Sequence, residues 1–328
     1  LITNRVFESD RNVLNQLSIN YDKKGGVVLD VSEIRNLSFD SRGNVLSQKV
    51  ATFSDIGKKE LLDIKVITNE NLDSSGNAAL VNILKFAKGA VVDGGAITED
   101  VASFIDATVI TTLKFDLRGN SLEQTIKKYS DSGLTKLVET QAIKNQPYDF
   151  QDRASRSSII TTNSTGAFVD RQEIVYVSYD LFGNAVSQTI ERYDSTDKLI
   201  DYKTILNTYA NPAAARRGNA THTTINRYQD LAKTKEIERQ EISNKTFDSV
   251  GNVVDQEVEL YVSGKLSRVT AIKNSNISNR GDAGNQEITT YTTDSDGKNP
   301  IESSYQLITN RVFDSDRNVL NQLSINYD

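Results

Sequence analysis

Apolar and polar residues alternate along much of this chain, in short stretches separated by turn-forming residues. In one stretch Leu122, Gln124 and Ile126 share one side of an extended segment, whereas Ser121 and Glu123 fall on the other. Side chains point alternately to the two faces of a β-strand, so this period of two predicts strands with one more apolar face. The pattern recurs at Leu46, Gln48 and Val50, at Val186, Gln188 and Ile190, and at Val254, Gln256 and Val258.

A turn motif precedes each of these stretches. It consists of an aromatic residue, Asp, two variable residues, Gly and Asn, with a Gln five positions after the Gly. The Asp of a tight turn accepts hydrogen bonds from backbone amides further along, and a left-handed Gly closes the turn. The motif therefore predicts β-hairpins. Its structural residues are Asp40, Gly43 and Gln48; Asp116, Gly119 and Gln124; Asp180, Gly183 and Gln188; and Asp248, Gly251 and Gln256.

Two further copies of the motif, near the ends of the sequence, carry Arg11 and Arg317 in place of Gly. A left-handed conformation strains any residue that has a Cβ atom, and Asn tolerates it best. We therefore expect Asn12 or Asn318 to adopt that conformation instead.

The Gln of the motif falls on the predicted apolar face, between two aliphatic side chains. A buried Gln needs hydrogen-bond partners for its amide group. One interpretation is that each Gln bonds a neighbouring backbone group and fixes the register of its hairpin. The other is a ladder of Gln side chains from unit to unit, or a row of Gln lining a polar lumen.

The motif recurs every 64 to 76 residues, and an element ending in Ile-x-Asn follows each hairpin, as at residues 136–145. This predicts about four antiparallel strands in a unit of roughly 66 residues. Residues 78–107 are rich in Ala and carry Gly94-Gly95, which predicts an insertion with a short helix near residues 99–105. We expect one repetitive β domain with units at 1–38 (short), 39–107, 108–172, 173–240 and 241–306, and another unit starting at 307–328.

Such units predict an all-β fold with two possible architectures. One is a repetitive antiparallel sheet of hairpin units that forms an open superhelix or tube. The other is a closed β-propeller of about five blades. Residues 1–22 reappear as 307–328 with Glu8 against Asp314 as the only difference, which points to a tandem period of 306 residues. An open stack accepts any number of periods, so we favour it and expect a fragment of a giant tandem-repeat protein.

Composition excludes several function classes. The chain has 328 residues and a net charge of −6, so a nucleic-acid partner is not expected. No apolar run approaches the roughly 20 residues of a membrane span. Cys and Met are absent, which fits an exposed extracellular protein. The single histidine, His222, lies in a Thr-rich segment, where we expect a solvated strand residue and not the base of an enzyme.

Two short motifs resemble known binding sequences, one for calcium and one for an adhesion receptor. Asp294, Asp296 and Asn299 place oxygen ligands around a Gly as part of a calcium loop does, although the later Glu of such a loop is missing. Simple hairpin turns explain them equally well, so no cofactor is expected apart from this weak calcium candidate. Residues 280–282 spell Arg-Gly-Asp, an adhesive tripeptide that also arises by chance.

The aromatic-Asp-x-x-Gly turns, together with Tyr193-Asp194 and Tyr21-Asp22 at strand ends, resemble the YD-repeat family of bacterial surface and toxin-shell proteins, which includes the Rhs proteins. The family's usual Gly-Arg is Gly-Asn here, and the unit is about three times as long as the family's repeat. The resemblance implies a long antiparallel sheet that spirals into a shell or tube on the bacterial cell surface.

The function expected is structural: a segment of a long bacterial cell-surface fibre, sheath or tube, assembled by stacking of β repeats. Its partners would be adjacent repeats or other copies of itself. The alternative is an adhesin that binds a surface glycan or protein through its variable loops. Those loops lie at residues 146–155, 211–219 and 275–284.

Overall fold

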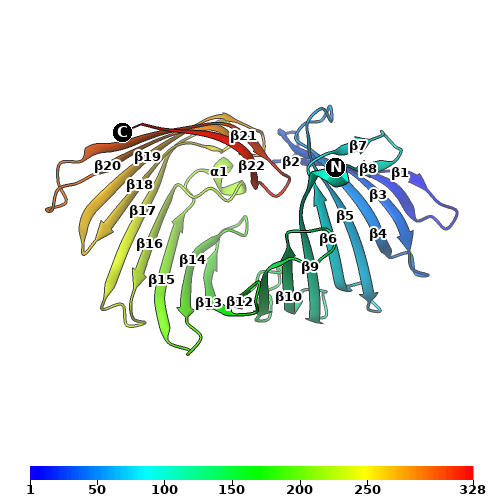
Figure 1. The fold of residues 1–328 in the computed structure, drawn as a ribbon, viewed down its shortest axis with the longest axis horizontal. Helices are drawn as coiled ribbons and strands as arrows, with labels where there is room; N and C mark the ends of the chain where they lie inside the picture. Colours follow the sequence, from blue (N-terminus) through cyan, green and yellow to red (C-terminus); the bar gives the residue numbers. More distant parts are fainter. Residues whose placement is uncertain (328) are drawn as a thin grey trace. The chain divides into compact units, whose positions relative to one another are not determined.

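A computed structural model describes residues 1–327 of the chain, and nearly all of them lie in β-strands or tight turns. In the described part there are 22 strands, one short α-helix and one 3-10 turn. Twenty of the strands belong to one antiparallel sheet, and β7 and β8 form a separate two-stranded sheet. The fold is therefore the open all-β sheet that the alternating pattern predicts (Figure 1).

The chain divides into two compact units, each of which is a meander of antiparallel hairpins. Unit 1 holds residues 1–152, 158–170 and 314–316, and unit 2 holds the remainder. The strands up to the division are β1 (Ile2–Phe7), β2 (Val13–Tyr21), β3 (Val28–Phe39), β4 (Val45–Phe53), β5 (Leu61–Leu72), β6 (Ala78–Phe86), β7 (Gly89–Val91), β8 (Ile97–Glu99), β9 (Phe104–Phe115), β10 (Ser121–Tyr129) and β11 (Leu137–Asn145). The 3-10 turn is η1 (Val101–Ser103).

The remaining elements follow the same meander. They are β12 (Arg156–Asn163) and β13 (Phe168–Tyr179), which contribute residues to both units, then β14 (Ala185–Tyr193), β15 (Leu199–Thr208), α1 (Pro212–Arg216), β16 (His222–Tyr228), β17 (Glu236–Phe247), β18 (Val253–Val262), β19 (Lys265–Ile277), β20 (Ala283–Thr292), β21 (Ile301–Phe313) and β22 (Val319–Tyr327).

Most strands pair with their neighbours in the meander, except that β6 pairs with β9 and that β7 and β8 pair only with each other. In unit 1 the ladder runs from β1 to β6 and on through β9, β10 and β11. In unit 2 it runs from β13 to β22. A propeller would divide such strands into separate four-stranded blades, so the propeller alternative is wrong. The superhelix or tube stays a prediction.

The repeating structural element is smaller than the predicted unit. The turn that follows β3 starts at Asp40 and the turn that follows β5 starts at Asp73, 33 residues later. One hairpin turn therefore recurs about every 33 residues, and each predicted unit of about 66 residues spans two of them. The 32-residue interval from Phe7 to Phe39, which marked a short first unit, is the spacing of one such hairpin.

The sheet of unit 1 buries the face opposite to the one predicted. Val31, Ala51, Phe53 and Ile64 are buried together, and in β4 Ala51 and Phe53 point away from the face of Gln48. Leu46, Gln48 and Val50, on the predicted face, are only half-buried. The apolar core of unit 1 thus lies on the face opposite to the predicted one, although Thr52, on the Gln48 face, is buried too.

The reason is the insertion, which covers that other face. Residues 87–103 leave the meander between β6 and β9, and β7 and β8 form a hairpin that brings Ile97 onto Val31 and Ile64. We call residues 89–99 the lid hairpin. The helix predicted near residues 99–105 is reduced to the 3-10 turn η1, which Asp100 caps by accepting a hydrogen bond from the Ala102 amide.

Candidate functional site: the stacked hairpin turns

The turn that joins β3 to β4 shows how the motif works. One carboxylate oxygen of Asp40 accepts hydrogen bonds from the amides of Arg42 at 2.8 Å and Asn44 at 2.9 Å. The other oxygen accepts from the Asn44 side chain at 2.9 Å. Gly43 has a φ of 85°, and its amide donates to the Asp40 carbonyl. The Asp, Gly and Asn of the motif therefore act together in one closed turn.

The same bonds recur at the three other full motifs. The carboxylates of Asp116, Asp180 and Asp248 each accept from two backbone amides and from the side chain of the following Asn. A fifth full turn, Asp73 to Asn77, joins β5 to β6 in the same way. The sequence motif missed it because Leu72 and Val81 stand where the other copies have an aromatic residue and a Gln.

The two terminal copies close their turns differently from the prediction. Arg11 has a φ of 67° and Arg317 a φ of 68°, whereas Asn12 and Asn318 are not among the residues with positive φ. The expectation that an Asn would take the left-handed position is therefore wrong. Arg11 and Arg317 therefore adopt the strained left-handed conformation at the turn position that Gly occupies in the other copies.

Successive turns of this kind stack against one another. In unit 1, a Cβ atom placed on Gly43 would lie 2.6 Å from Asn12 Oδ1. The same Cβ on Gly76 would lie 2.7 Å from Asn44 Oδ1, and on Gly119 it would lie 2.7 Å from Asn77 Oδ1. Each turn's Asn thus occupies the space that the next turn's Gly leaves empty. We call this series of contacting turns the turn row.

Unit 2 has a turn row of its own. A Cβ on Gly281 would lie 2.8 Å from Asn252 Oδ1. The helix α1 replaces one tight turn, and Arg217 after it donates to the carbonyl oxygens of Val250 and Asn279, both at 2.7 Å. Arg217 therefore ties the α1 turn to the next two turns of the row.

A second set of asparagines fastens each hairpin to the one before it. Asn36 Nδ2 donates to the carbonyl of Val13 at 2.8 Å, and Asn69 Nδ2 donates to that of Val45 at 3.0 Å. Each donor stands four residues before a turn, and each acceptor is the first residue after the previous turn. We call these donors the clamp asparagines. The others are Asn145 to Ser121, Asn207 to Ala185, Asn244 to Ala220 and Asn274 to Val253.

The motif Gln can join this clamp. Gln256 lies opposite Asn244 in register and donates to Asn244 Oδ1 at 2.8 Å, while Asn244 itself donates to Ala220. Gln286 and Asn274 repeat the arrangement at 2.8 Å. Gln48 lies opposite Asn36, whereas Gln188 faces Tyr176 and Gln124 faces Thr112. At Gln256 the partner is thus a cross-strand Asn, which neither interpretation of the sequence foresaw.

Hydrogen bonds from the turn lower the pKa of two of the turn carboxylates. The side chain and then the backbone amide of Asn44 lower the pKa of Asp40 from 3.8 to about 2. The Asn77 side chain in the same way lowers the pKa of Asp73. The charged form of each carboxyl is the form that holds the turn closed.

The calcium candidate is built as one more turn. The carboxylate of Asp294 accepts hydrogen bonds from the amides of Asp296 and Lys298 and from the side chain of Asn299. In residues 1–327 no three or more His, Cys, Asp or Glu side chains gather as metal ligands. The structure brings the three predicted residues together as a hairpin turn, and calcium binding stays a prediction.

The predicted recognition loops belong to the turn rows. In unit 1, Arg118 donates to the carbonyl of Asp149 at 2.7 Å, which ties residues 149–152 to the neighbouring turn. In unit 2, the Arg280 and Asp282 side chains of the Arg-Gly-Asp tripeptide are buried, and Asp282 accepts from Arg317 at 2.7 Å. A tripeptide held in this way is not presented to a receptor.

His222 lies on β16 beside two side chains of β17. Its Nε2 is 2.9 Å from the Glu241 carboxylate, and its Nδ1 is 3.2 Å from Ser243 Oγ. The side chain is partly exposed, as expected for a strand residue at the surface. No helix in the described part of the chain is long and apolar enough to cross a membrane.

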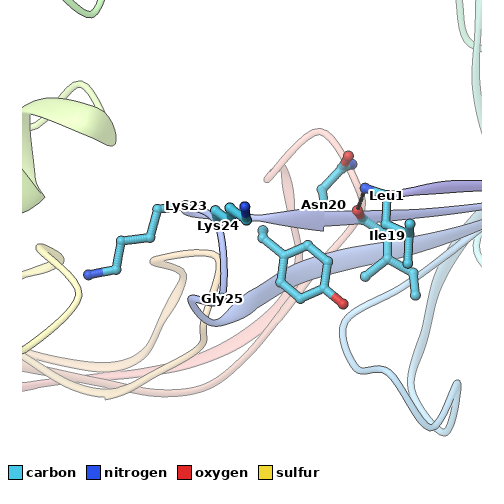
Figure 2. Close-up of a pocket in the computed structure, with 7 residues that line it drawn as sticks. Leu1, Ile19, Asn20, Lys23, Lys24 and Gly25 are labelled. Carbon is cyan, nitrogen blue, oxygen red and sulfur yellow. Dashed lines mark hydrogen bonds between the residues drawn. The ribbon is translucent and has the colours of Figure 1, made fainter.

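A hollow of about 520 Å³ lies at the outer edge of β2 (Figure 2). Leu1, Ile19, Asn20 and Tyr21 line it together with the turn at residues 23–25. Leu1 closes one end, where its amino group donates to the Ile19 carbonyl at 2.8 Å. In the second copy of this sequence, Gln306 and Tyr305 of β21 pair with Asn326 and Tyr327, which correspond to Asn20 and Tyr21.

No protein-family model and no curated protein matches this chain. Two solved structures match most of its length. The crystal structure of TcdB2-TccC3 without its hypervariable C-terminal region is 13% identical with a TM-score of 0.16, and the match covers 95% of this chain and 20% of that one. The Photorhabdus luminescens Tc holotoxin pore with a substituted TccC3 is 12% identical with a TM-score of 0.15, covering 97% and 22%. This chain spans about a fifth of the length of the chains it matches.

Proposed function

We propose that this chain is a structural segment of a long bacterial cell-surface fibre, sheath or tube, in which β repeats stack along one sheet. The observation that carries the proposal is the ladder of neighbours: every strand pair within each unit joins strands that are adjacent in the meander. In such a structure stability adds up over nearest neighbours, so length has no upper limit and no reaction centre is needed.

The turn row and the clamp asparagines support the same function. They repeat from hairpin to hairpin, and each connects only one hairpin with its neighbours. A fibre under mechanical load needs such contacts between every pair of neighbouring hairpins, because the sheet would separate at any pair that lacked them. The resemblance of the turns to YD-repeat proteins, and the 306-residue duplication, agree with a cell-surface shell or fibre assembled from adjacent repeats.

An adhesin is the second candidate, and one observation favours it. Leu117 and Phe150 stand at the tips of neighbouring turns in unit 1, with Phe150 85% exposed and Leu117 fully exposed. Two large apolar side chains on adjacent turns form a small patch that a protein or glycan partner could cover. The remaining turns of unit 1 carry Ser at this position, as at Ser41 and Ser74.

Electron microscopy of proteins that contain one, two and three 306-residue periods tests the structural proposal. We expect rods of constant width whose length grows in proportion to the number of periods. Separate globules joined like beads would contradict it. In parallel, binding of the one-period protein to a glycan array tests the adhesin, and Leu117→Ser with Phe150→Ser is its control. A defined affinity that this double substitution abolishes would favour the adhesin.

A further inference from the structure

We propose that a hollow over β19, β20 and β21 of unit 2 binds an acidic sugar, namely a hexuronate unit of a polysaccharide. The hollow has a volume of about 340 Å³, and we call it the arginine hollow. The residues that line it are Asn274, Gly281, Asp282, Ala283, Gln286, Arg311, Phe313 and Arg317. The proposal goes beyond the structural function above and does not depend on it.

The arginine hollow lies within the ladder of unit 2 and not at its edge. β19 pairs with β18 and β20, β20 pairs with β19 and β21, and β21 pairs with β20 and β22. Each of the three strands that line it therefore has a hydrogen-bonded neighbour on both sides. Among the described residues, none of β22 contributes to the lining.

Arg311 is the cation of this hollow that lacks a matching anion. Its Nη1 donates to the carbonyl of Ala283 at 3.4 Å, and within residues 1–327 it makes neither a second hydrogen bond nor an ion pair. Its Nε is buried without an acceptor in the same part of the chain. A guanidinium carries several N–H donors in a planar fork that matches the two oxygens of a carboxylate. Arg311 thus has free capacity for a bound carboxylate.

Fastening one hairpin to the next does not require the charge of Arg311. It donates to the first residue after the previous turn, which is the task that the clamp asparagines perform with a neutral amide, as Asn244 and Asn274 do. The guanidinium is also held in place, because its Cζ lies over the ring of Phe313 at 5.0 Å from the ring centroid. A charged and oriented group at this position therefore points to a further task, the binding of an anion.

Arg317 adds a second guanidinium on the solvent side of the arginine hollow. Its side chain is 54% exposed, and its Nε donates to Asp282 Oδ1 at 2.7 Å. The other carboxylate oxygen of Asp282 lies 3.8 Å from the buried guanidinium of Arg280. Asp282 is thus already neutralised by two arginines, and the lining keeps a net positive charge although the whole chain carries −6. Such a local field favours an anionic ligand.

The remaining lining selects a ligand with hydroxyl groups around its carboxylate. Gln286 Nε2 donates to Asn274 Oδ1 at 2.8 Å, whereas Gln286 Oε1 accepts no hydrogen bond within residues 1–327. That oxygen is therefore available to a hydroxyl donor. The volume is in the range of pockets that hold a whole small molecule, and it exceeds what a carboxylate alone needs. A hexuronate carries one carboxylate and several hydroxyls on a single ring, so it matches both Arg311 and Gln286.

An NMR titration of the 328-residue chain with sodium galacturonate tests the site. We expect a saturable shift of the Gly281 amide signal, which every variant retains. Arg311→Gln keeps an amide donor for Ala283 and should weaken binding by about 10- to 100-fold. Arg317→Gln, at an exposed position, is a second variant and should weaken binding several-fold. Arg268→Gln is the matched control, because Arg268 lies exposed on β19 outside the hollow, and it should leave the affinity unchanged.

Three further ligands separate the sugar acid from other anions. Galactose lacks the carboxylate and acetate lacks the ring, so each should bind at least about tenfold more weakly than galacturonate. Acetate or inorganic phosphate that binds as tightly as galacturonate would reduce the hollow to a general anion site and overturn the sugar assignment. The absence of a saturable shift would overturn the site itself, and so would an affinity for galacturonate that neither Arg311→Gln nor Arg317→Gln lowers.

Discussion

Asn77 lies so close to Gly119 that a Cβ atom at position 119 would approach Asn77 Oδ1 to 2.7 Å. The two residues are 42 positions apart and belong to consecutive turns of unit 1. Gly119 therefore has two tasks: its φ of 89° closes its own turn, and its missing side chain makes room for the previous turn. The stacking of turns in the row depends on the second task.

Substitution of this glycine separates the two tasks. Gly183 has the same motif and a φ of 87°, but a Cβ there would meet nothing within 4 Å. We expect Gly183→Ala to lower the free energy of unfolding by about 1 kcal/mol through backbone strain alone. Gly119→Ala should cost about 1 kcal/mol more, because Asn77 must move and weaken its bond to Asp73. Urea denaturation of both variants measures the difference, and equal costs would contradict the stacking.

The clamp in unit 2 predicts coupling between Gln256 and Asn244. Asn244→Ala removes the donor to Ala220 and the acceptor for Gln256, and we expect a loss of about 1–3 kcal/mol. Gln256→Ala should cost more than Gln188→Ala, since Gln188 faces Tyr176 and not an Asn. A double-mutant cycle should give a coupling energy of about 0.5–1.5 kcal/mol. Strict additivity of Asn244→Ala and Gln256→Ala would rule the clamp out.

The turn carboxylates predict loss of stability in acid. The folded-state pKa of Asp40 lies at about 2, below its ordinary value of 3.8. A lowered pKa stabilises the fold above the ordinary value, and this stabilisation is lost as the pH falls through the folded-state value. Asp40→Asn should therefore differ most from the wild type above about pH 4 and least near about pH 2.

Denaturation at several pH values measures this convergence, and parallel stability curves would contradict it. Asn44→Ala provides an independent reading. Because the Asn44 side chain is the largest cause of the shift, its removal should move the pKa of Asp40 back toward 3.8. An NMR titration of the Asp40 carboxyl carbon follows that change directly.

Because the lid hairpin closes the apolar core of unit 1, substitutions in the lid should cost more stability than substitutions in an exposed turn. Ile97 is buried against Val31 and Ile64, so Ile97→Ala should lower the free energy of unfolding by about 2–4 kcal/mol. Ile56 lies exposed in a turn of the same unit, and Ile56→Ala should change stability by less than about 0.5 kcal/mol. Thermal denaturation compares the two variants. Similar effects would mean that the lid hairpin does not close over the sheet.

The hairpins could be predicted from the sequence because their turns are decided locally. Asp40, Gly43 and Asn44 make their bonds within five residues, so their chemistry can be recognised without a fold. The Asp73 turn was missed because the motif required an aromatic residue before the Asp and a Gln five positions after the Gly, where this copy has Leu72 and Val81. The Asp-x-x-Gly-Asn pattern alone would have found it.

The contacts between hairpins could not be predicted in this way. Asn36 stood out as the end of an Ile-x-Asn pattern, but its partner is a carbonyl 23 residues earlier, which only the strand register brings near. The buried face of unit 1 was wrong for a similar reason. The alternation of apolar and polar residues in β4 shows that the strand has two different faces. Which face is buried depends on Ile97, which lies on an insertion more than 40 residues away.

The direction of the clamp asparagines has a consequence for biosynthesis. In every case the donor lies after its acceptor in the chain, as Asn69 does after Val45 and Asn274 after Val253. A polypeptide that emerges amino end first therefore offers each carbonyl before the amide that will bind it. As far as the clamps are concerned, each hairpin can therefore be fastened to the one before it as soon as it emerges, and only the core of unit 1 waits for Ile97 of the lid hairpin.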